Sequence, residues 1–242
     1  MRVIILAAGA GNRMGTSNLM PKCLLKINGT TIIERLINQL QSLHINDITL
    51  VVGYKKKMII DVVSKINKKI KFICNHAYKE DTNILSLTLA LKDRLSPYYL
   101  FEADCVFDNN CIDLIFDPRF SNQSVWFSKG LLKSGQYGGV IKADNFGKVK
   151  DLRVINQYDQ KYKCYNKLIG IMKVGETEID NYAYHLFNAY QKNIKQYYHL
   201  PWINNLSELN SYLCDFGDFK VASVNSISDY ESAKELFKNE AC

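Results

Sequence analysis

Short apolar runs alternate with helical patterns through the first half of the sequence. The runs at 3–7, 47–52, 70–75 and 98–103 are rich in β-branched and aromatic residues, which favour strands. Helical spacing of apolar residues marks 31–43, and helices are also expected at 57–68 and 84–95. Strands that alternate with helices imply right-handed β-α-β crossovers. The sequence therefore predicts an α/β fold, with a Rossmann-like, mainly parallel (mixed) sheet flanked by helices.

The second half of the chain has a less regular pattern. Strands are expected at 124–128, 140–142, 152–155, 167–174 and 220–224, and helices at 177–192, 206–213 and 228–238. Linkers, repeats and low-complexity segments are not evident in the sequence. We therefore predict a single domain over residues 1–242, whose halves divide near residue 120.

The charge balance favours an anionic partner. The formal net charge is +7, yet no run of basic residues is longer than Lys55 to Lys57. Such a balance does not by itself separate nucleic acids from nucleotides or phosphorylated metabolites. Because the basic residues are dispersed, we interpret the excess as a field around a pocket for a small anionic substrate, and we expect no nucleic-acid partner.

Cysteine usage and hydrophobicity indicate where the protein resides. The seven Cys are odd in number and form no C-x-x-C pair, which argues against disulfides or zinc and for a reducing compartment. The apolar start is too short for a signal sequence, and no stretch approaches the roughly 20 apolar residues that cross a bilayer. We expect a cytoplasmic protein without membrane contact. The sequence leaves open whether it forms a homodimer.

A glycine-rich loop follows the first predicted strand. It reads LAAGAGNRMG over residues 6–15, and Pro21-Lys22 comes shortly after. Glycines after a buried strand let backbone N–H groups approach phosphate oxygens closely, because no Cβ intervenes. Arg13 and Lys22 would add positive charge where a polyphosphate lies. This segment predicts a phosphate-binding loop.

Other phosphate-binding loops fit this segment less well. The third glycine of G-x-G-x-x-G is replaced by Met14, and a G-K-[ST] sequence is missing, which excludes a Walker-type loop. An NAD(P)-dependent enzyme would also need an acidic residue about 20 positions further on, closing the next strand. The corresponding stretch here is Pro21-Lys22-Cys23-Leu24, which contains no acidic residue and therefore argues against an NAD(P)-dependent enzyme.

The loop resembles the signature L-A-A-G-x-G-x-R, a spacer, then P-K, of nucleotidyltransferases that activate sugar phosphates and choline phosphate. The resemblance implies the nucleotide-diphospho-sugar transferase type of fold, with a nucleotide-binding first half and an acceptor-binding second half. It assigns neutralisation of the triphosphate to Arg13 and Lys22. It also implies that the loop binds the nucleotide through Leu6, Ala7, Ala8, Gly9, Ala10, Gly11 and Asn12.

An acidic residue follows the fourth predicted strand. Asp104 and the loop at Gly9 stand at the carboxyl ends of two strands, where ligands collect in parallel sheets. The segment Phe101-Glu102-Ala103-Asp104 resembles the motif whose Asp holds Mg²⁺ in this family, and a hard cation needs such a carboxylate. Asp104 could instead be a turn or capping residue. We place Glu102 on the other side of the strand and do not count it as a ligand.

A third segment lies near the C-terminus. Residues 225–230 (NSISDY) resemble the D-S-x-x-D-Y of bacterial choline-phosphate cytidylyltransferases, whose first Asp is the second metal ligand. That position is Asn225 here. An amide oxygen can still bind Mg²⁺, and uridylyltransferases that make UDP-N-acetylglucosamine use Asn there. Asp229 most simply caps the last helix.

The resemblance to the choline-phosphate branch covers most of the chain and suggests a base-binding segment. Residues 82–87 (TNILSL) stand where that family places its base-reading loop. Asn83 and Ser86, with the backbone near Ala8 and Gly9, are the candidates for recognising the base. The Asn83 amide offers a donor and an acceptor to cytosine, but it could equally cap the helix that starts at Ile84.

The acceptor is suggested by a departure from the choline branch. Where that branch carries Glu-Trp, this chain has Gly135-Gln136-Tyr137-Gly138, which favours a smaller, more polar acceptor. The related cytidylyltransferases of capsule phosphoramidate pathways use L-glutamine phosphate, which we favour over choline phosphate; a sugar 1-phosphate is a further alternative. The candidate acceptor-binding residues are Gln136, Tyr137, Lys129, Lys167 and Trp202, although each could equally be a core or surface residue.

The reaction implied by the resemblance is in-line attack of an acceptor phosphate oxygen on the α-phosphorus of CTP, with pyrophosphate leaving. The attacking oxygen is already anionic, so no general base is needed. The four His residues, at 44, 76, 185 and 199, form no evident constellation that would supply one. A regulatory nucleotide-binding subunit is the alternative outside enzymes, although such subunits often lose the Lys or the acidic residue that are present here.

Overall fold

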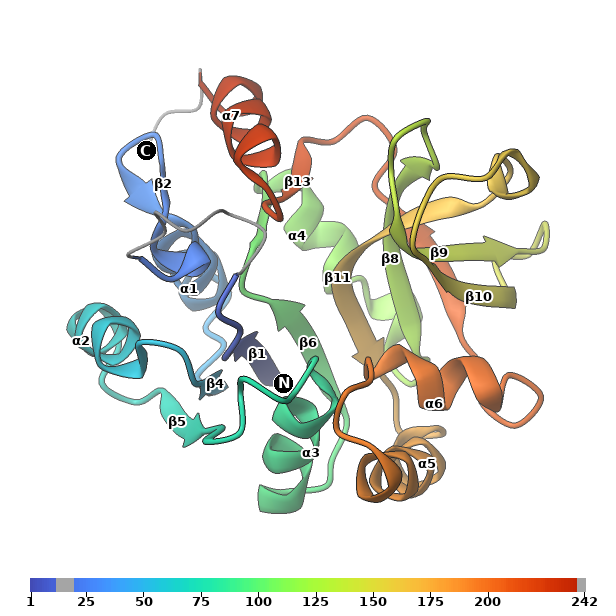
Figure 1. Cartoon of the computed structure of the whole chain (residues 1–242), viewed down its shortest axis with the longest axis horizontal. Helices are drawn as coiled ribbons and strands as arrows, with labels where there is room; N and C mark the ends of the chain where they lie inside the picture. Colours follow the sequence, from blue (N-terminus) through green and yellow to red (C-terminus); the bar gives the residue numbers. More distant parts are fainter. Residues whose placement is uncertain (12–19, 239–242) are drawn as a thin grey trace.

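The protein is described here from a computed structural model, which covers residues 1–11 and 20–238. Its centre is a mixed sheet, in which strands follow the order β10-β9-β11-β6-β1-β4-β5, and β8 and β12 join beside β11 (Figure 1). The small antiparallel pairs β2–β3 and β7–β13 lie outside this sheet. The mixed α/β fold predicted from the sequence is confirmed.

The parallel half of the sheet comes from the first half of the chain. Its strands are β1 (Arg2–Ala7), β4 (Asp47–Val52), β5 (Lys71–Cys74) and β6 (Tyr98–Glu102). On β1, Ile4 pairs with Thr49 on one side and with Leu100 on the other, so this strand is central. Alternate β1 side chains enter the two opposite core clusters. The strand is therefore buried on both faces, as its continuous apolar run predicts.

The second half of the chain completes the sheet with antiparallel strands. These are β8 (Val125–Leu131), β9 (Gly138–Ala143), β10 (Val149–Ile155) and β11 (Asn166–Val174), while β12 (Tyr212–Asp215) runs parallel to β8. β11 pairs with β6, where Ile171 faces Phe101, and so joins the two halves. The short strands β2 (Lys26–Ile27), β3 (Thr30–Thr31), β7 (Cys105–Phe107) and β13 (Val221–Ser223) form the two small pairs.

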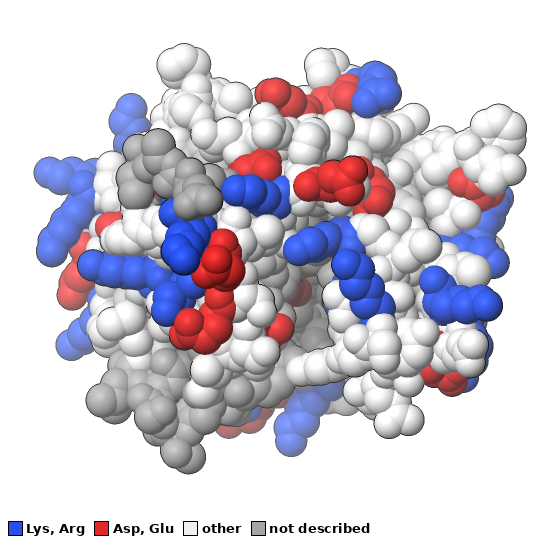
Figure 2. Space-filling view, turned by 90° about the horizontal axis from the view of Figure 1, so that it is seen from above, with Lys and Arg blue, Asp and Glu red and all other residues white. Residues whose placement is uncertain are grey.

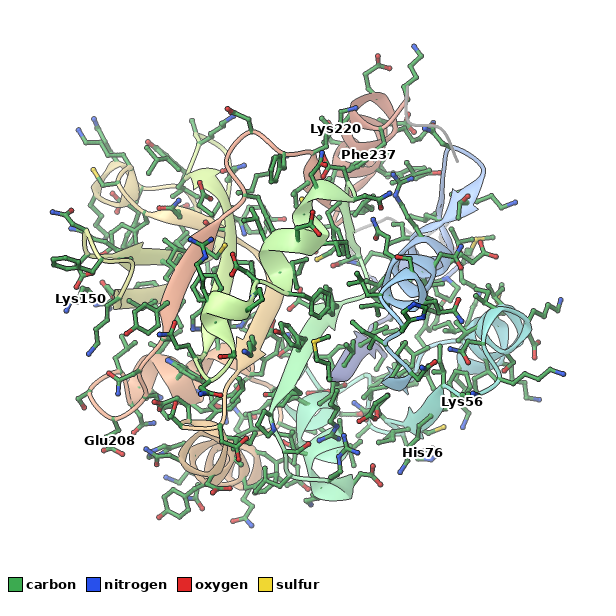
Figure 3. The ribbon with its side chains drawn as sticks, turned by 180° about the vertical axis from the view of Figure 1, so that it is seen from behind. Lys56, His76, Lys150, Glu208, Lys220 and Phe237 are labelled. Carbon is green, nitrogen blue, oxygen red and sulfur yellow. The ribbon has the colours of Figure 1, made fainter. Side chains whose placement is uncertain are left out.

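Helices cover both faces of the sheet. α1 (Ile32–Ser42), α2 (Lys56–Ile66) and α4 (Asn110–Ile115) pack into one core cluster, and α3 (Ile84–Asp93), α5 (Ile179–Lys192) and α6 (His199–Asn204) pack into the other. α7 (Ile227–Leu236) closes a smaller cluster beside β2. Seen from behind, Lys56 of α2 and Lys150 of β10 mark opposite ends of the sheet (Figure 3). Among the described residues, no helix combines the length and apolar character that crossing a membrane requires.

One predicted helix is wrong. Residues 206–213 have apolar side chains at helical spacing, but the structure has turns there, and the strand β12 begins at Tyr212. β12 pairs with β8, and the Asp215 carboxylate accepts hydrogen bonds from Ser128 Oγ and Gly130 N at 2.5 and 2.6 Å. These long-range bonds outweigh a local helical preference, which is worth only a fraction of a kcal/mol per residue, or about 0.7 at most.

Candidate active site

A cavity of about 700 Å³ opens at the carboxyl ends of β1 and β6. Figure 2 looks onto this edge of the sheet and shows a hollow flanked by basic and acidic side chains. The sequence-predicted residues that line the cavity are Leu6, Ala7, Ala8, Gly9, Ala10, Gly11, Lys22, Asn83, Ser86, Asp104 and Asn225. Asn12 and Arg13 were also predicted to bind nucleotide, and they lie outside the described residues. The rest of the predicted nucleotide set thus gathers around one cavity.

The loop after β1 reaches the cavity because its neighbours leave space for it. Tyr54 N donates a hydrogen bond to the Ala8 carbonyl at 3.0 Å, which fixes the first turn of the loop. Gly53 packs so closely that a Cβ there would lie 2.8 Å from the Ala8 oxygen. Gly11 has φ +67°, and a Cβ on it would lie 2.8 Å from Cγ of Lys22. Glycine at position 11 therefore allows the aliphatic part of Lys22 to lie against the loop.

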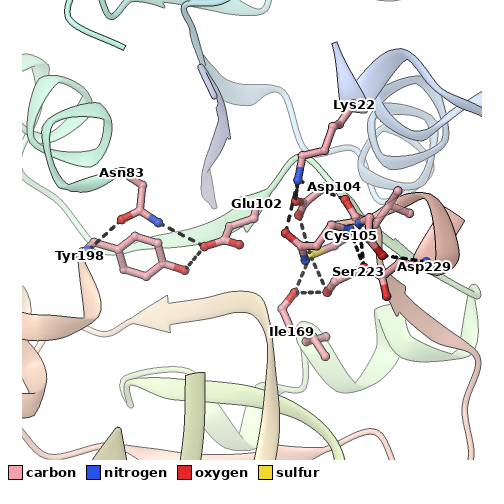
Figure 4. A network of polar contacts seen from close by, with 12 residues as sticks. Lys22, Asn83, Glu102, Asp104, Cys105, Ile169, Tyr198, Ser223 and Asp229 are labelled. Atoms are coloured by element: carbon pink, nitrogen blue, oxygen red, sulfur yellow. Dashed lines mark hydrogen bonds and ion pairs between the residues drawn. The ribbon is translucent and has the colours of Figure 1, made fainter. Parts of the chain in front are cut away.

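Lys22 reaches three oxygen atoms from distant parts of the chain. Its Nζ lies 2.6 Å from Asp104 Oδ2, 3.3 Å from Asn225 Oδ1 and 3.1 Å from the Val224 carbonyl (Figure 4). The side chains of Lys22 and Asp104 are only 16% and 13% exposed. The basic residue and the two candidate metal ligands predicted from the sequence thus form one cluster.

Pairing of β13 with β7 brings Asn225 to Asp104. β7 begins directly after Asp104, and Ser223 of β13 pairs with Cys105. Val224 N then donates to the Asp104 carbonyl at 2.9 Å, which places the next residue beside the carboxylate. The Asp229 carboxylate accepts hydrogen bonds from the backbone N–H groups of Asn225 and Ser226, within a capping box at the start of α7. The capping role predicted for Asp229 is confirmed.

Glu102 belongs to the cavity, so its predicted position was wrong. Glu102 ends β6, Asp104 lies in the turn after it, and both line the cavity. Glu102 Oε1 accepts hydrogen bonds from the Tyr198 hydroxyl at 3.0 Å and from Asn83 Nδ2 at 3.4 Å. Burial, followed by the negative charge of Asp104, raises the pKa of Glu102 to about 7.

Asn83 stands at the N-cap position of α3, but its side chain connects two elements and does not cap the helix. Its Oδ1 accepts a hydrogen bond from Tyr198 N at 2.9 Å, and its side chain makes no capping bond. The Asp81 carboxylate makes such bonds to the first turn instead, accepting from Leu85 N at 3.0 Å and Ser86 N at 2.9 Å. The capping alternative weighed for Asn83 is therefore wrong. Its amide is held at the cavity wall, between α3 and the segment before α6.

Ser86 is held in place by its neighbours. Its hydroxyl donates to Asp81 Oδ2 at 2.7 Å and accepts from Asn75 Nδ2 at 2.9 Å. Ser86 is 3% exposed. Partial burial raises the pKa of the Asp81 carboxyl. Hydrogen bonds from Ser86, Leu85 and Asn75 oppose that rise. Ser86 thus orients Asp81, which also lines the cavity.

The predicted acceptor-binding residues do not gather in the same way. Trp202 is 0% exposed and packs in the core against Trp126 and Tyr182, so its predicted role in lining the acceptor site is wrong. Lys129 Nζ donates to the Val221 carbonyl, and Gln136 Oε1 accepts from Lys133 N within a surface turn. Neither side chain belongs to the lining of the cavity.

Lys167 and Tyr137 lie on the acceptor half that the sequence predicts. Lys167 Nζ donates to the Leu168 carbonyl at 2.7 Å and the Gly139 carbonyl at 3.4 Å. Burial lowers the pKa of Lys167, and the nearby charges of Glu102 and Asp104 oppose that shift. Lys167 is thus within electrostatic range of the cavity carboxylates. Tyr137 is 43% exposed on the loop before β9.

The residues that line the cavity without having been predicted as site residues include Tyr78, Lys79, Asp81 and Tyr197. Tyr78, Lys79 and Asp81 directly precede the predicted base-reading segment at 82–87. Their closeness to that segment in the sequence could have identified them as cavity residues. Tyr197 comes from more than 100 residues further along the chain. It is brought there by Asn83, which binds Tyr198 N, and by Ile84 N, which donates to the Gln196 carbonyl at 3.3 Å. A local sequence pattern cannot predict a contact between residues this far apart in the chain.

Comparisons with known proteins agree with this geometry. Residues 3–116 match the family model described as MobA-like NTP transferase domain. The choline-phosphate cytidylyltransferase of Streptococcus pneumoniae is 28% identical over 99% of this chain and 100% of that protein. The 2-aminoethylphosphonate cytidylyltransferase of Lancefieldella rimae is 28% identical over 93% of this chain and 89% of that protein. These alignments extend well beyond the glycine loop.

Solved structures share the fold. The CTP:phosphocholine cytidylyltransferase of S. pneumoniae superposes with a TM-score of 0.84 at 24% identity, covering 98% of both chains. The inositol-1-phosphate CTP transferase of T. maritima superposes with a TM-score of 0.74 at 15% identity, covering 100% of this chain and 98% of that one. The fold is therefore of the nucleotide-diphospho-sugar transferase type. Residues 3–116 match the model of the MobA-like NTP transferase domain, and over its full length the chain is a homologue of choline-phosphate cytidylyltransferase.

Proposed function

We propose that this nucleotidyltransferase is a magnesium-dependent cytidylyltransferase that joins CTP to a small phosphorylated acceptor. The observation that carries the proposal is the meeting of Lys22, Asp104 and Asn225 beside the loop at residues 8–11. Two full-length relatives named as cytidylyltransferases support CTP as the nucleotide. In the proposed reaction, an acceptor phosphate oxygen bonds to the α-phosphorus as the bond to the β-phosphate bridging oxygen breaks. Pyrophosphate leaves with that oxygen.

The oxygen atoms around Lys22 suit a hard cation. Asp104 Oδ2, Asn225 Oδ1 and the Val224 carbonyl all lie within 3.3 Å of the Lys22 ammonium, so this group of oxygens already accommodates a positive charge. Among the described residues, no three His, Cys, Asp or Glu side chains gather as a metal site. A carboxylate with an amide oxygen fits Mg²⁺, which usually keeps several waters and phosphate oxygens as ligands. When bound, Mg²⁺ would offset the negative charge that develops on the leaving pyrophosphate.

The residues of the chain would contribute position and charge. We propose that Lys22, with Arg13, binds triphosphate oxygens, and that the backbone of Ala8 and Gly9 lies against the base with Asn83. Ser86 would act by orienting Asp81. Such fixed donors lower the barrier because they need no reorganisation as charge shifts in the transition state. No general base is required, since the attacking oxygen is anionic.

For the acceptor, we propose L-glutamine phosphate first and choline phosphate second. Where the choline branch carries Glu-Trp, this sequence has the polar Gln136 and Tyr137, which supports the first, and neither residue lines the cavity in this structure. The names of the relatives support an acceptor that carries a nitrogen group together with a phosphate or phosphonate. Capsule biosynthesis and a cytoplasmic location belong to the same proposal.

Pyrophosphate release tests the proposal. The purified protein would be assayed with CTP, UTP, ATP and GTP against L-glutamine phosphate, choline phosphate, 2-aminoethylphosphonate and glucose 1-phosphate, with Mg²⁺ or with EDTA. We expect release only with CTP, only with Mg²⁺, and best with L-glutamine phosphate. If pyrophosphate is released with choline phosphate alone, choline phosphate becomes the proposed acceptor, and the proposed reaction is unchanged. Release confined to UTP and glucose 1-phosphate, or none with any pair, would refute the cytidylyltransferase.

A further inference from the structure

The carboxylate of Glu102 lines the cavity, and phosphate binding does not use it. It ends β6 inside the cavity and accepts hydrogen bonds from neutral donors, the Tyr198 hydroxyl and the Asn83 amide. In the part of the chain that the structure describes, Glu102 forms no ion pair. Removing a carboxylate from water is unfavourable unless a cation or sufficient hydrogen bonds replace the solvent. Lys22 and Lys167 act on Glu102 without forming an ion pair with it, so a cationic ligand is the partner that would complete its surroundings.

We propose that Glu102 is a specificity residue that binds the positively charged nitrogen of an amine- or trimethylammonium-bearing phosphorylated acceptor. This inference rests on the proposed function and adds the group that recognises the end of the acceptor remote from its phosphate. CTP carries no cationic group, so the nucleotide cannot provide this partner. The acceptor is the remaining component of the reaction that can bring an organic cation into the cavity.

The surroundings hold this carboxylate in place. Gly170 of β11 has φ +79°, and a Cβ there would lie 2.7 Å from Glu102 Oε2. Tyr198 is 0% exposed, and its backbone N–H is fixed by Asn83. Three elements, β6, β11 and the segment before α6, therefore determine where the carboxylate lies. A fixed charge of this kind discriminates between ligands better than a mobile one, because less entropy is lost on binding.

Glu102 lines the same cavity as the phosphate-binding cluster. It ends β6, and Asp104 lies in the turn that follows this strand. Figure 4 shows two polar groups, one with Lys22 and Asp104 and the other with Glu102, Asn83 and Tyr198. An acceptor with a short linker between phosphate and nitrogen can reach from the first group to the second. Tyr197 also lines the cavity, and an aromatic ring in the lining favours an organic cation.

The test compares Glu102→Gln with the wild-type protein on matched acceptors. Choline phosphate is paired with 3,3-dimethylbutyl phosphate, its uncharged carbon isostere, and 2-aminoethylphosphonate with propylphosphonate. We expect the wild type to prefer each cationic acceptor. Glu102→Gln should lower kcat/KM for the cationic acceptors by about 10- to 100-fold, as loss of a charged hydrogen bond predicts, mainly through KM. The values for the neutral acceptors should stay within about twofold, as should KM for CTP.

Control variants separate this role from a structural or metal-binding one. Glu80→Gln removes an exposed carboxylate that is not part of the cavity lining and should leave every constant unchanged. Tyr198→Phe keeps the Glu102 charge and should retain the preference for cationic acceptors. The Mg²⁺ concentration for half-maximal activity should be equal in wild type and Glu102→Gln, because Glu102 is not proposed as a metal ligand. Thermal melting confirms that each variant is folded, and Glu102→Ala, which also removes the charge, replaces Glu102→Gln if the latter is not.

Several results would overturn the inference. These are an equal loss on cationic and neutral acceptors, a changed Mg²⁺ requirement in Glu102→Gln, unchanged constants in that variant, or a wild type without preference for the cation. In each case the cytidylyltransferase reaction itself would still be observed with CTP, so the proposed function would stand. If the wild type releases no pyrophosphate with any acceptor, the proposed function fails first and the inference falls with it.

Discussion

The ammonium nitrogen of Lys22 lies 2.6 Å from a carboxylate oxygen of Asp104, although the two residues are 82 positions apart in the chain. Lys22 starts a short 3-10 turn after the glycine loop, and Asp104 follows β6, which pairs directly with β1. The central pairing of these strands therefore determines the contact. It joins the polyphosphate-binding part of the proposed site to its proposed metal ligand.

Replacing Lys22 tests the proposed catalytic cluster. We expect Lys22→Ala to lower kcat by about a hundredfold or more, as does removal of other preorganised electrostatic groups. Asp104→Ala should have an effect of similar size and should weaken activation by Mg²⁺. Lys26→Ala, which removes an exposed basic residue nearby, is the matched control. Near-normal turnover in folded Lys22→Ala would contradict the assignment of this residue.

Substitution of Gly11 tests whether the loop must leave space for Lys22. Gly11→Ala places a Cβ 2.8 Å from Lys22 Cγ at a φ of +67°, so we expect reduced stability and at least a tenfold loss of kcat/KM. Gly29→Ala is the control, because Gly29 has a φ of +83° but open space around it. That control should lose about 1 kcal/mol of unfolding free energy from the left-handed backbone alone, without loss of activity. Equal kinetics in both variants would show that the loop tolerates a Cβ.

Asp81 supports the wall of the cavity through the start of α3. Its carboxylate accepts from Leu85 N, Ser86 N, Ser86 Oγ and Asn75 Nδ2. We expect Asp81→Ala to reduce the free energy of unfolding by about 1–3 kcal/mol and to raise KM for CTP. Asp61→Ala, on the exposed side of α2, should change neither. Urea unfolding and steady-state kinetics measure the two effects. An unaltered KM for CTP in Asp81→Ala would show that the start of α3 does not contribute to nucleotide binding.

The buried His199 predicts how stability depends on pH. Burial, then the charge of Lys167, lowers the pKa of His199 to about 3, below the value of about 6.5 expected in the unfolded chain. Between these values the unfolded state binds the proton more readily, so stability should fall as pH decreases from 6.5 towards 3. The contribution has a slope of up to about 1.4 kcal/mol per pH unit.

His199→Phe isolates this contribution. The His199 ring stacks on Trp126 and Tyr198 at centroid distances of 5.3 and 4.2 Å, and Phe can replace it without a titrating group. Urea midpoints measured between pH 7 and pH 5 should change less in His199→Phe than in the wild type. His76→Gln, at an exposed position, should keep the wild-type slope. Identical slopes in wild type and His199→Phe would rule out a neutral buried His199.

Some sequence predictions concerned local patterns, and these agree closely with the structure. The strand at 47–52 has the predicted bounds, and α1 begins after Thr31, whose side chain forms a capping box with Glu34. Resemblance to a known family then selected Lys22, Asp104 and Asn225, which lie together in the structure. The kinetics of Lys22→Ala and Asp104→Ala test their proposed catalytic role.

Other features depended on contacts that no local pattern contains. The sequence by itself determined the order of strands and helices and the glycine loop, because periodicity and backbone freedom act over a few residues. Only the tertiary structure decided that Glu102 faces the cavity with Tyr198, that Trp202 is buried in the core, and that β12 replaces a predicted helix. Each of these outcomes follows from hydrogen bonding or packing between residues far apart in the chain, whose combined free energy exceeds local preference.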